Sequence, residues 1–177
     1  MPDVLTHLLI GVSLALVLRR NGPRAEQMLI ILGALLIDIE RPVSWILAET
    51  SLDWIGLGSG FHSILGAVVL SYFAASCFKL ENKNFKSIFF LILIGCISHL
   101  ILDMVMYPWQ EYGIYLLYPV KIAFSFHLLW NDVWWYPLVG LACLVAALCI
   151  RYILRKTLDE SKDVQVLEKT AKSQNSN

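Results

Sequence analysis

Charged residues are scarce in this sequence, and neither sign of charge dominates. Only 16% of the 177 residues are Asp, Glu, Lys or Arg, and 14 basic residues balance 14 acidic ones. A neutral chain lacks the positive field that attracts nucleic acid, so no nucleic acid partner is expected. Apolar residues make up 58% of the chain, whereas a soluble domain usually contains about 45–50%. This composition predicts an integral membrane protein, with the lipid bilayer as its first partner.

The sequence also lacks a cysteine framework and a signal peptide. Each of its four cysteines lies within an apolar run, and no two of them form a C-x-x-C pair: Cys77, Cys96, Cys143 and Cys149. This placement favours small hydrophobic residues over disulfides or a thiolate metal site. The start of the chain, Met1-Pro2-Asp3, is acidic where a signal peptide is basic, so we expect no cleaved signal.

Five apolar runs cover most of the chain: residues 4–18, 25–39, 61–78, 85–107 and 133–154. A helix that crosses a bilayer needs about 20 residues, so the fourth run is long enough and the first two are short. We predict an all-α integral membrane protein with about five transmembrane helices. Its membrane domain would span residues 1–156, and residues 157–177 would form a polar, disordered tail or a short surface helix. Residues 112–130 are interpreted as a loop, and a sixth crossing is the alternative.

The basic residues predict how the protein is oriented. If all five runs cross, twelve of the 14 Lys and Arg residues lie on one side, and only Arg41 and Lys121 lie on the other. Since basic loops favour the cytoplasm, we expect a multi-pass protein of the inner (cell) membrane with its N-terminus outside and its C-terminus in the cytoplasm. All six tryptophans then fall on the outer side, which indicates an aromatic belt or, alternatively, a substrate-facing mouth.

The most informative stretch is Ser98-His99-Leu100-Ile101-Leu102-Asp103, near the end of the fourth run. His99 and Asp103 are four residues apart and therefore share one helix face. An ionisable pair in such an apolar run needs a partner, a metal or a water-filled cavity. One nitrogen and one oxygen ligand suit a zinc-like cation. A His–Asp hydrogen bond that holds helices together is the alternative.

Other polar residues fall at the same outer helix ends in the five-span topology. His7 opens the first run, Asp38 and Glu40 end the second, and His62 opens the third. Imidazole and carboxylate ligands without thiolate suit Zn²⁺, Mn²⁺ or Fe²⁺. Each residue also has a simpler interpretation: a helix-start position for His7, pairing of the two acids with Arg41, and an interfacial location for His62.

These motifs resemble the YdjM-like (DUF457) family of small inner-membrane proteins, described as metal-dependent hydrolases. The resemblance covers roughly residues 5–120 and rests on five pieces, of which the fourth is the most specific: Thr6-His7-Leu8-Leu9, Leu35 to Pro42, Phe61-His62-Ser63-Ile64-Leu65, Ser98 to Asp103, and Gly113 to Pro119. It implies metal ligands at His7, Asp38, His62, His99 and Asp103. Through the His-x-x-x-Asp helix, the family is also distantly similar to zinc phospholipase C and P1-type nucleases, which suggests phosphoesters.

The sequence departs from the family pattern in two places. Where the family usually has Pro-Asp-x-Asp-His, this chain has Ile37-Asp38-Ile39-Glu40-Arg41, and arginine cannot ligate a metal. The family's His-Arg pair is also absent from residues 56–60. A second metal and catalytic activity are therefore the least supported of the implied properties.

The favoured function is a membrane-bound, metal-dependent hydrolase that acts at the outer face on an ester or phosphoester, including lipids. One or two divalent metals, zinc or manganese, would activate a water, and Asp38 and Glu40 would be the catalytic carboxylates. His127 and Asp132 are interpreted as surface residues. The alternative is a non-enzymatic membrane scaffold or regulator with a structural or inactive polar cluster. A transporter is less favoured, because its polar groups should lie near the bilayer midplane.

Overall fold

The computed structural model describes residues 4–19, 22–39, 42, 60–80, 83–105, 114–126 and 135–174, with the backbone alone from 158 onward. Five α-helices occupy these residues: α1 Val4–Leu18, α2 Arg24–Leu36, α5 Ile64–Cys77, α6 Phe85–Val105 and α7 Tyr136–Gln174. A short 3-10 helix, η1 Ile37–Ile39, continues α2. The described chain contains no strand apart from one isolated bridge, so the predicted all-α fold is confirmed.

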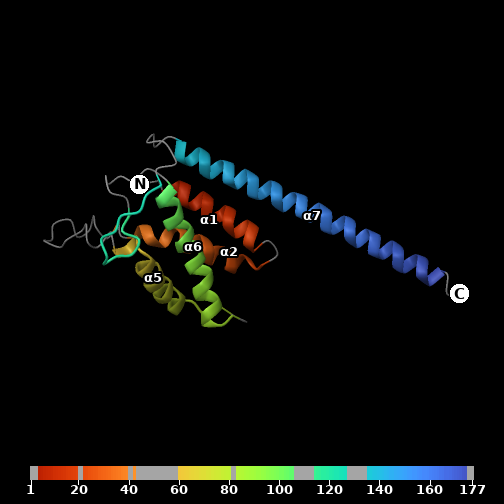
Figure 1. The fold of residues 1–177 in the computed structure, drawn as a ribbon. Helices are drawn as coiled ribbons and strands as arrows, with labels where there is room; N and C mark the ends of the chain where they lie inside the picture. Colours follow the sequence, from red (N-terminus) through yellow and green to blue (C-terminus); the bar gives the residue numbers. More distant parts are fainter. Residues whose placement is uncertain are drawn as a thin grey trace.

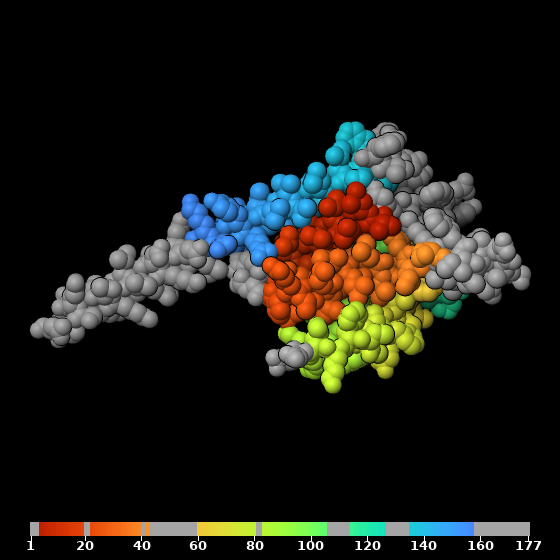
Figure 2. All heavy atoms as spheres, turned by 180° about the vertical axis from the view of Figure 1, so that it is seen from behind, coloured from red at the N-terminus to blue at the C-terminus, as the bar shows by residue number. Residues whose placement is uncertain are grey.

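Helix α6 lies at the centre of the bundle (Figure 1). It packs against α2 on one side and α5 on another, while α1 packs against both α2 and α7. Helix α7 lies along the outside of α1 (Figures 1 and 2) and runs past the end of the bundle (Figure 1). Because α1, α2, α5 and α6 alternate in direction, the start of α1, the end of α2, the start of α5 and the end of α6 meet at one end of the bundle.

Small residues allow the central pair of helices to touch. Gly33 of α2 and Gly95 of α6 lie face to face, and a Cβ added at Gly95 would lie 2.8 Å from the Cα of Gly33 and 2.7 Å from the amide nitrogen of Ala34. Close backbone approach at glycine is the usual way in which helices associate in a membrane, where burial of apolar surface supplies little driving force. The glycine pair therefore sets the distance between α2 and α6.

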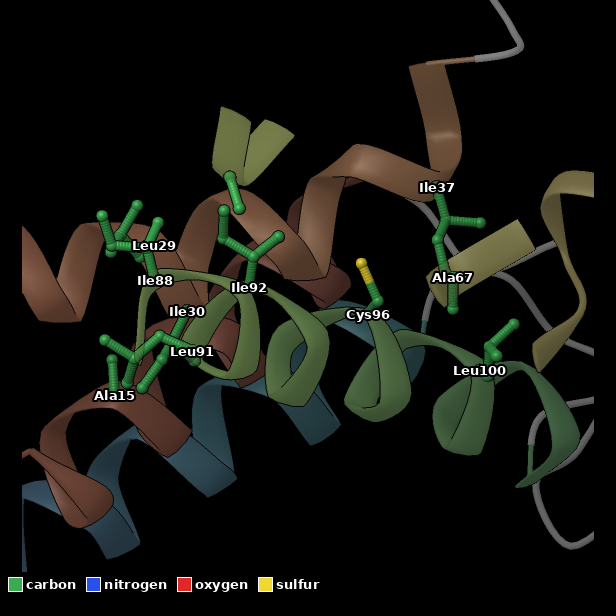
Figure 3. Close-up of a cluster of buried hydrophobic side chains, with 11 residues drawn as sticks. Ala15, Leu29, Ile30, Ile37, Ala67, Ile88, Leu91, Ile92, Cys96 and Leu100 are labelled. Carbon is green, nitrogen blue, oxygen red and sulfur yellow. The ribbon is translucent and has the colours of Figure 1, made fainter. Parts of the chain in front are cut away.

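The buried apolar core follows one face of α6. Figure 3 shows this face running from Ile88 through Ile92 and Cys96 to Leu100, at the four-residue spacing of a helix stripe. The sulfur of Cys96 accepts a hydrogen bond from the Ser71 hydroxyl of α5 at 3.4 Å. All four cysteines are free, as their spacing indicates.

Among the residues that the structure describes, two helices are long and apolar enough to cross a membrane: α6, and residues 136–157 of α7. Helices α1, α2 and α5 contain 15, 13 and 14 residues, fewer than the roughly 20 that a straight spanning helix needs. The prediction of five crossings is therefore not supported, because three of the five apolar runs form helices that end too early.

Two regions that the sequence left open have defined backbone structure. Helix α7 continues through Gln174, so residues 157–174 are helical, and the division of the chain at residue 156 stays a prediction. Residues 114–126 form no helix, and Ile114 pairs with Phe124 in an antiparallel bridge. Within its described part, this segment is the predicted loop and not a sixth helical crossing.

At the end of the bundle opposite the His62 and Asp103 end, a buried glutamate, Glu26, links three segments of the chain. The Glu26 side chain, in the first turn of α2, is 1% exposed and forms ion pairs with Arg19 after α1 and Lys83 before α6. Lys83, together with Arg19, lowers the pKa of Glu26 below its ordinary value, although burial acts in the opposite direction. The three residues therefore join α1, α2 and α6 at this end.

Candidate metal centre

All five residues that the resemblance implies as metal ligands lie together at the end of the bundle where the four helix ends meet. Each of them is at most 6% exposed: His7, Asp38, His62, His99 and Asp103. They come from α1, η1, the turn before α5, and α6. Residues up to 96 positions apart in the chain are thus collected into one buried cluster, which we call the His/Asp centre.

The turn before α5 is what places His62. Ser63 is the N-cap of α5: its hydroxyl accepts from the Gly66 amide at 3.0 Å and donates to the Gly60 carbonyl at 2.6 Å. Such a cap fixes the direction in which the chain enters a helix. The turn folds tightly over Gly66, where an added Cβ would lie 2.8 Å from the Phe61 carbonyl oxygen. His62 is therefore held from both sides by a rigid backbone.

The end of α2 supplies both a carboxylate and an orienting carbonyl. Asp38 lies in η1, the 3-10 turn that tightens the end of α2, and is buried. One turn earlier, the Ala34 carbonyl lies 2.7 Å from Nδ1 of His99. A carbonyl can only accept, so Nδ1 carries the proton and a neutral His99 presents a bare Nε2. A hydrogen bond of this kind is how proteins orient histidines that bind metals.

Asp103 is the hub of the centre. Its Oδ2 lies 3.2 Å from Nε2 of His99, one turn earlier on α6, and 3.6 Å from Nε2 of His62. Its Oδ1 lies 3.4 Å from Nε2 of His7. Asp38 Oδ1 lies farther away, 4.0 Å from Nε2 of both His62 and His99. Both oxygens of one buried carboxylate thus face histidine nitrogens from three different segments.

These separations test whether the residues fit a cation. Hydrogen bonds between nitrogen and oxygen are centred near 2.9 Å, and the three contacts of Asp103 are all longer. Two ligands of a tetrahedral zinc ion with bonds of about 2.0–2.1 Å lie about 3.3–3.4 Å apart. The 3.2, 3.4 and 3.6 Å contacts bracket this value. The donor set of three imidazoles and two carboxylates also suits zinc or manganese, so the residues fit a divalent cation.

Two overlapping groups of ligand atoms can be drawn within this centre. One contains His7, His99 and Asp103, the other Asp38, His62 and His99, and the atoms of each group lie within 4.8 Å of one another. His99 belongs to both groups but has one bare nitrogen, since Nδ1 donates to Ala34. One nitrogen lone pair binds one cation, so His99 could serve only one of the two groups at a time.

Not every predicted residue can be placed. Glu40, the second predicted catalytic carboxylate, and Arg41 lie outside the described residues, as do His127 and Asp132. The structure also adds a participant that no sequence motif marks. The Ala34 carbonyl orients His99, but a backbone oxygen leaves no trace in residue type, and only the three-dimensional packing of α2 on α6 reveals it.

Comparison with known proteins identifies a family for this chain. A family profile described as YdjM inner membrane protein matches residues 1–159. No curated protein and no solved structure matches the chain. The match covers the helices that build the His/Asp centre and the long apolar part of α7. The chain belongs to the YdjM inner membrane protein family.

Proposed function

We propose that the protein is a membrane-bound hydrolase whose His/Asp centre holds one divalent cation, zinc or manganese. The observation that carries this proposal is the spacing around Asp103: three histidine nitrogens lie 3.2–3.6 Å from its two oxygens in a buried site. These distances are long for hydrogen bonds and match neighbouring ligands of one cation. When bound, such a cation lowers the pKa of a water molecule and polarises an ester or phosphoester oxygen.

The residues of the centre would divide the work. His7, His62, His99 and Asp103 would hold the ion, with Ala34 keeping the bare nitrogen of His99 directed inward. Oδ1 of Asp38 lies 4.0 Å from Nε2 of His62 and of His99, farther than the oxygens of Asp103 lie. Asp38 is therefore the candidate to accept a proton from the attacking water. Glu40 follows two residues later in the chain and is the second candidate for that role.

The substrate would be an ester or phosphoester carried by a lipid or a small molecule at the outer face of the membrane. The centre lies close to one end of α6, with Asp103 two residues from the last residue of the helix, Val105. Since α6 is a candidate span, this position is near a membrane surface and far from the midplane. The concentration of Lys and Arg at the other helix ends supports an outward-facing centre, with the N-terminus outside and the C-terminus in the cytoplasm.

Metal analysis and a substrate screen test the proposal together. The detergent-purified full chain should contain close to one equivalent of zinc or manganese, and it should hydrolyse some member of a panel of esters and phosphoesters. His99→Ala should lose both the metal and the hydrolysis. Ser98→Ala is the matched control, because within the described part of the chain the Ser98 hydroxyl bonds only to the Gly95 carbonyl of its own helix. Near-zero metal in the wild type and in all variants would overturn the proposal.

A non-enzymatic membrane scaffold or regulator is the second candidate. The feature that favours it is Arg41, which occupies the position where the family usually has histidine. In that case the His/Asp centre is a structural polar network or an inactive site. Asp103→Asn distinguishes the two functions: loss of metal with unchanged thermal stability supports the hydrolase, whereas unfolding of a protein that never held metal supports the scaffold.

A further inference from the structure

The segment 114–126 is fastened to the two elements that carry most of the His/Asp centre. The Ile64 amide, at the start of α5, donates to the Leu116 carbonyl at 3.0 Å, and the Phe126 amide donates to the Met104 carbonyl of α6 at 2.8 Å. Within the segment, Ile114 and Phe124 exchange two backbone hydrogen bonds of 2.9 and 3.1 Å. Figure 1 shows the segment in teal beside the start of α5 and the end of α6. It is therefore a fixed loop next to the centre.

The outer side of this loop is strongly apolar. Four large hydrophobic side chains are about half exposed or more: Leu117 at 47%, Val120 at 53%, Ile122 at 51% and Phe126 at 61%. The single charged residue of the segment, Lys121, is exposed among them. A group of large apolar residues of this kind marks a binding surface on a protein, because exposing apolar side chains to water is unfavourable and covering them is favourable.

The apolar surface continues from the loop onto α5. Ile64 and Leu65 are 48% and 58% exposed, and the Ile64 amide is hydrogen-bonded to Leu116, beside Leu117. Farther along α5, Val68, Val69, Tyr72 and Phe73 are exposed as well. In a member of an inner membrane family, an exposed apolar helix face of this kind contacts lipid, so continuity indicates the same occupant for the loop.

We propose that residues 114–126 form a lipid-docking loop that lies in the boundary between headgroups and acyl chains, beside the His/Asp centre. Leu117, Val120 and Ile122 contact acyl chains there, and Lys121 extends its aliphatic stem through the same layer to reach lipid phosphates. The proposal rests on membrane location and surface chemistry and does not depend on hydrolysis. Its consequence is that lipid covers a loop whose hydrogen-bonded anchors, Ile64 and Met104, lie close to His62 and Asp103 in the chain.

Site-directed fluorescence in vesicles tests the docking loop. In the full chain, the exposed Cys77, Cys143 and Cys149 are replaced by serine, while Cys96, which is 0% exposed, is retained. Single cysteines at Val120 and Ile122 are labelled with an environment-sensitive dye. Tyr72→Cys on the exposed face of α5 serves as the lipid reference, and Lys79→Cys after α5 serves as the water reference. The vesicles contain phosphatidylethanolamine and phosphatidylglycerol, with or without lipids that carry a nitroxide quencher near the headgroup.

Labels at Val120 and Ile122 should emit at shorter wavelength than the label at Lys79 and should be quenched by the headgroup nitroxide. Emission like that of Lys79 would overturn the proposal, because the loop would then face water. A shift to shorter wavelength without nitroxide quenching would also overturn it, since protein, such as a second copy of the chain, would cover the loop. The readout needs no metal or activity, so a failed hydrolase proposal and a failed docking proposal give different results.

Discussion

The imidazole rings of His7 and His99 are stacked, with centroids 3.7 Å apart and planes inclined by 9°. Their Nε2 atoms face different oxygens of the same carboxylate, Asp103, at 3.4 and 3.2 Å. Two imidazolium cations stacked this closely in a buried site would repel each other strongly. The arrangement therefore disfavours a state in which both rings are charged, and neutral histidine is the form that binds a metal.

The difference in surroundings between His7 and His62 predicts different effects on metal affinity. His62 faces both Asp38 and Asp103, whereas His7 faces Asp103 alone among the described contacts. His7→Ala removes a ligand that contacts only one of the described carboxylates, so it should weaken metal binding and still leave one ion per chain, held by His62, His99 and Asp103. His62→Ala should abolish stoichiometric binding. Competition titration with a chelator measures both, and equal losses in the two variants would contradict the division of roles.

Asp103→Asn should remove the cation and retain the fold. The amide keeps the shape of the carboxylate but removes the negative charge that faces three histidines. Carboxylate charge is what draws the cation into the site, so metal content should fall to background. Asp103→Glu is the matched control, because it keeps the charge and should retain part of the metal. Metal content is measured on purified protein, and helix content by circular dichroism.

If Asp103→Asn bound metal as the wild type does, the hub role of Asp103 would be wrong. If the variant lost its helical signal instead, and the wild type held no metal, the carboxylate would be a structural group, which is the scaffold interpretation. In the first case, Asp38 and His62 would remain as the core of the site; in the second, the metal proposal would fall for the whole centre.

The sequence predicted the composition of the centre because its residues stand out chemically. A histidine or aspartate within an apolar run, such as His99, is visible without any structure, and antiparallel helices place run ends together. The predicted number of crossings is not supported, because an apolar run does not determine where a helix stops: α2 ends at Leu36, and η1 follows. The Ala34 carbonyl that orients His99 was invisible, since every residue has one.

The glycine contact between α2 and α6 predicts a coupled loss of stability and metal binding in Gly95→Ala. The added methyl would meet the backbone of α2 at Gly33 and Ala34, and overpacking of this kind costs about 1–3 kcal/mol. Since Ala34 also orients His99, separating the helices should weaken metal binding too. Ile101→Ala, at a position of α6 that is 55% exposed, is the control and should change neither property. Thermal unfolding in detergent, with and without chelator, measures both.

Should Gly95→Ala unfold at the wild-type temperature and bind metal equally well, the contact would not set the helix spacing. A loss of stability with unchanged metal affinity would also be informative. It would show that the hydrogen bond from His99 to Ala34 survives a shift of the helices, and that the tight packing at Gly33 serves the fold alone.

Glu26 predicts a pH-dependent contribution to stability at the opposite end of the bundle. Lys83 and Arg19 lower the pKa of Glu26 in the folded protein, so the folded state favours the ionised carboxylate more than the unfolded state does. The stabilisation is therefore present above the ordinary glutamate pKa of 4.5 and is lost as the pH falls through and below it. Glu26→Gln should lower the unfolding temperature at pH 7, and the difference from the wild type should shrink as the pH is lowered toward 3.

Lys83→Met should lower the unfolding temperature at pH 7 as well, because it leaves a buried acid with one partner fewer. As a control, both variants should bind metal at the distant His/Asp centre as the wild type does at pH 7. A difference in unfolding temperature between Glu26→Gln and the wild type that stayed constant from pH 7 to pH 3 would contradict the prediction. It would show that the amide perturbs packing and that the ion pairs add no stability.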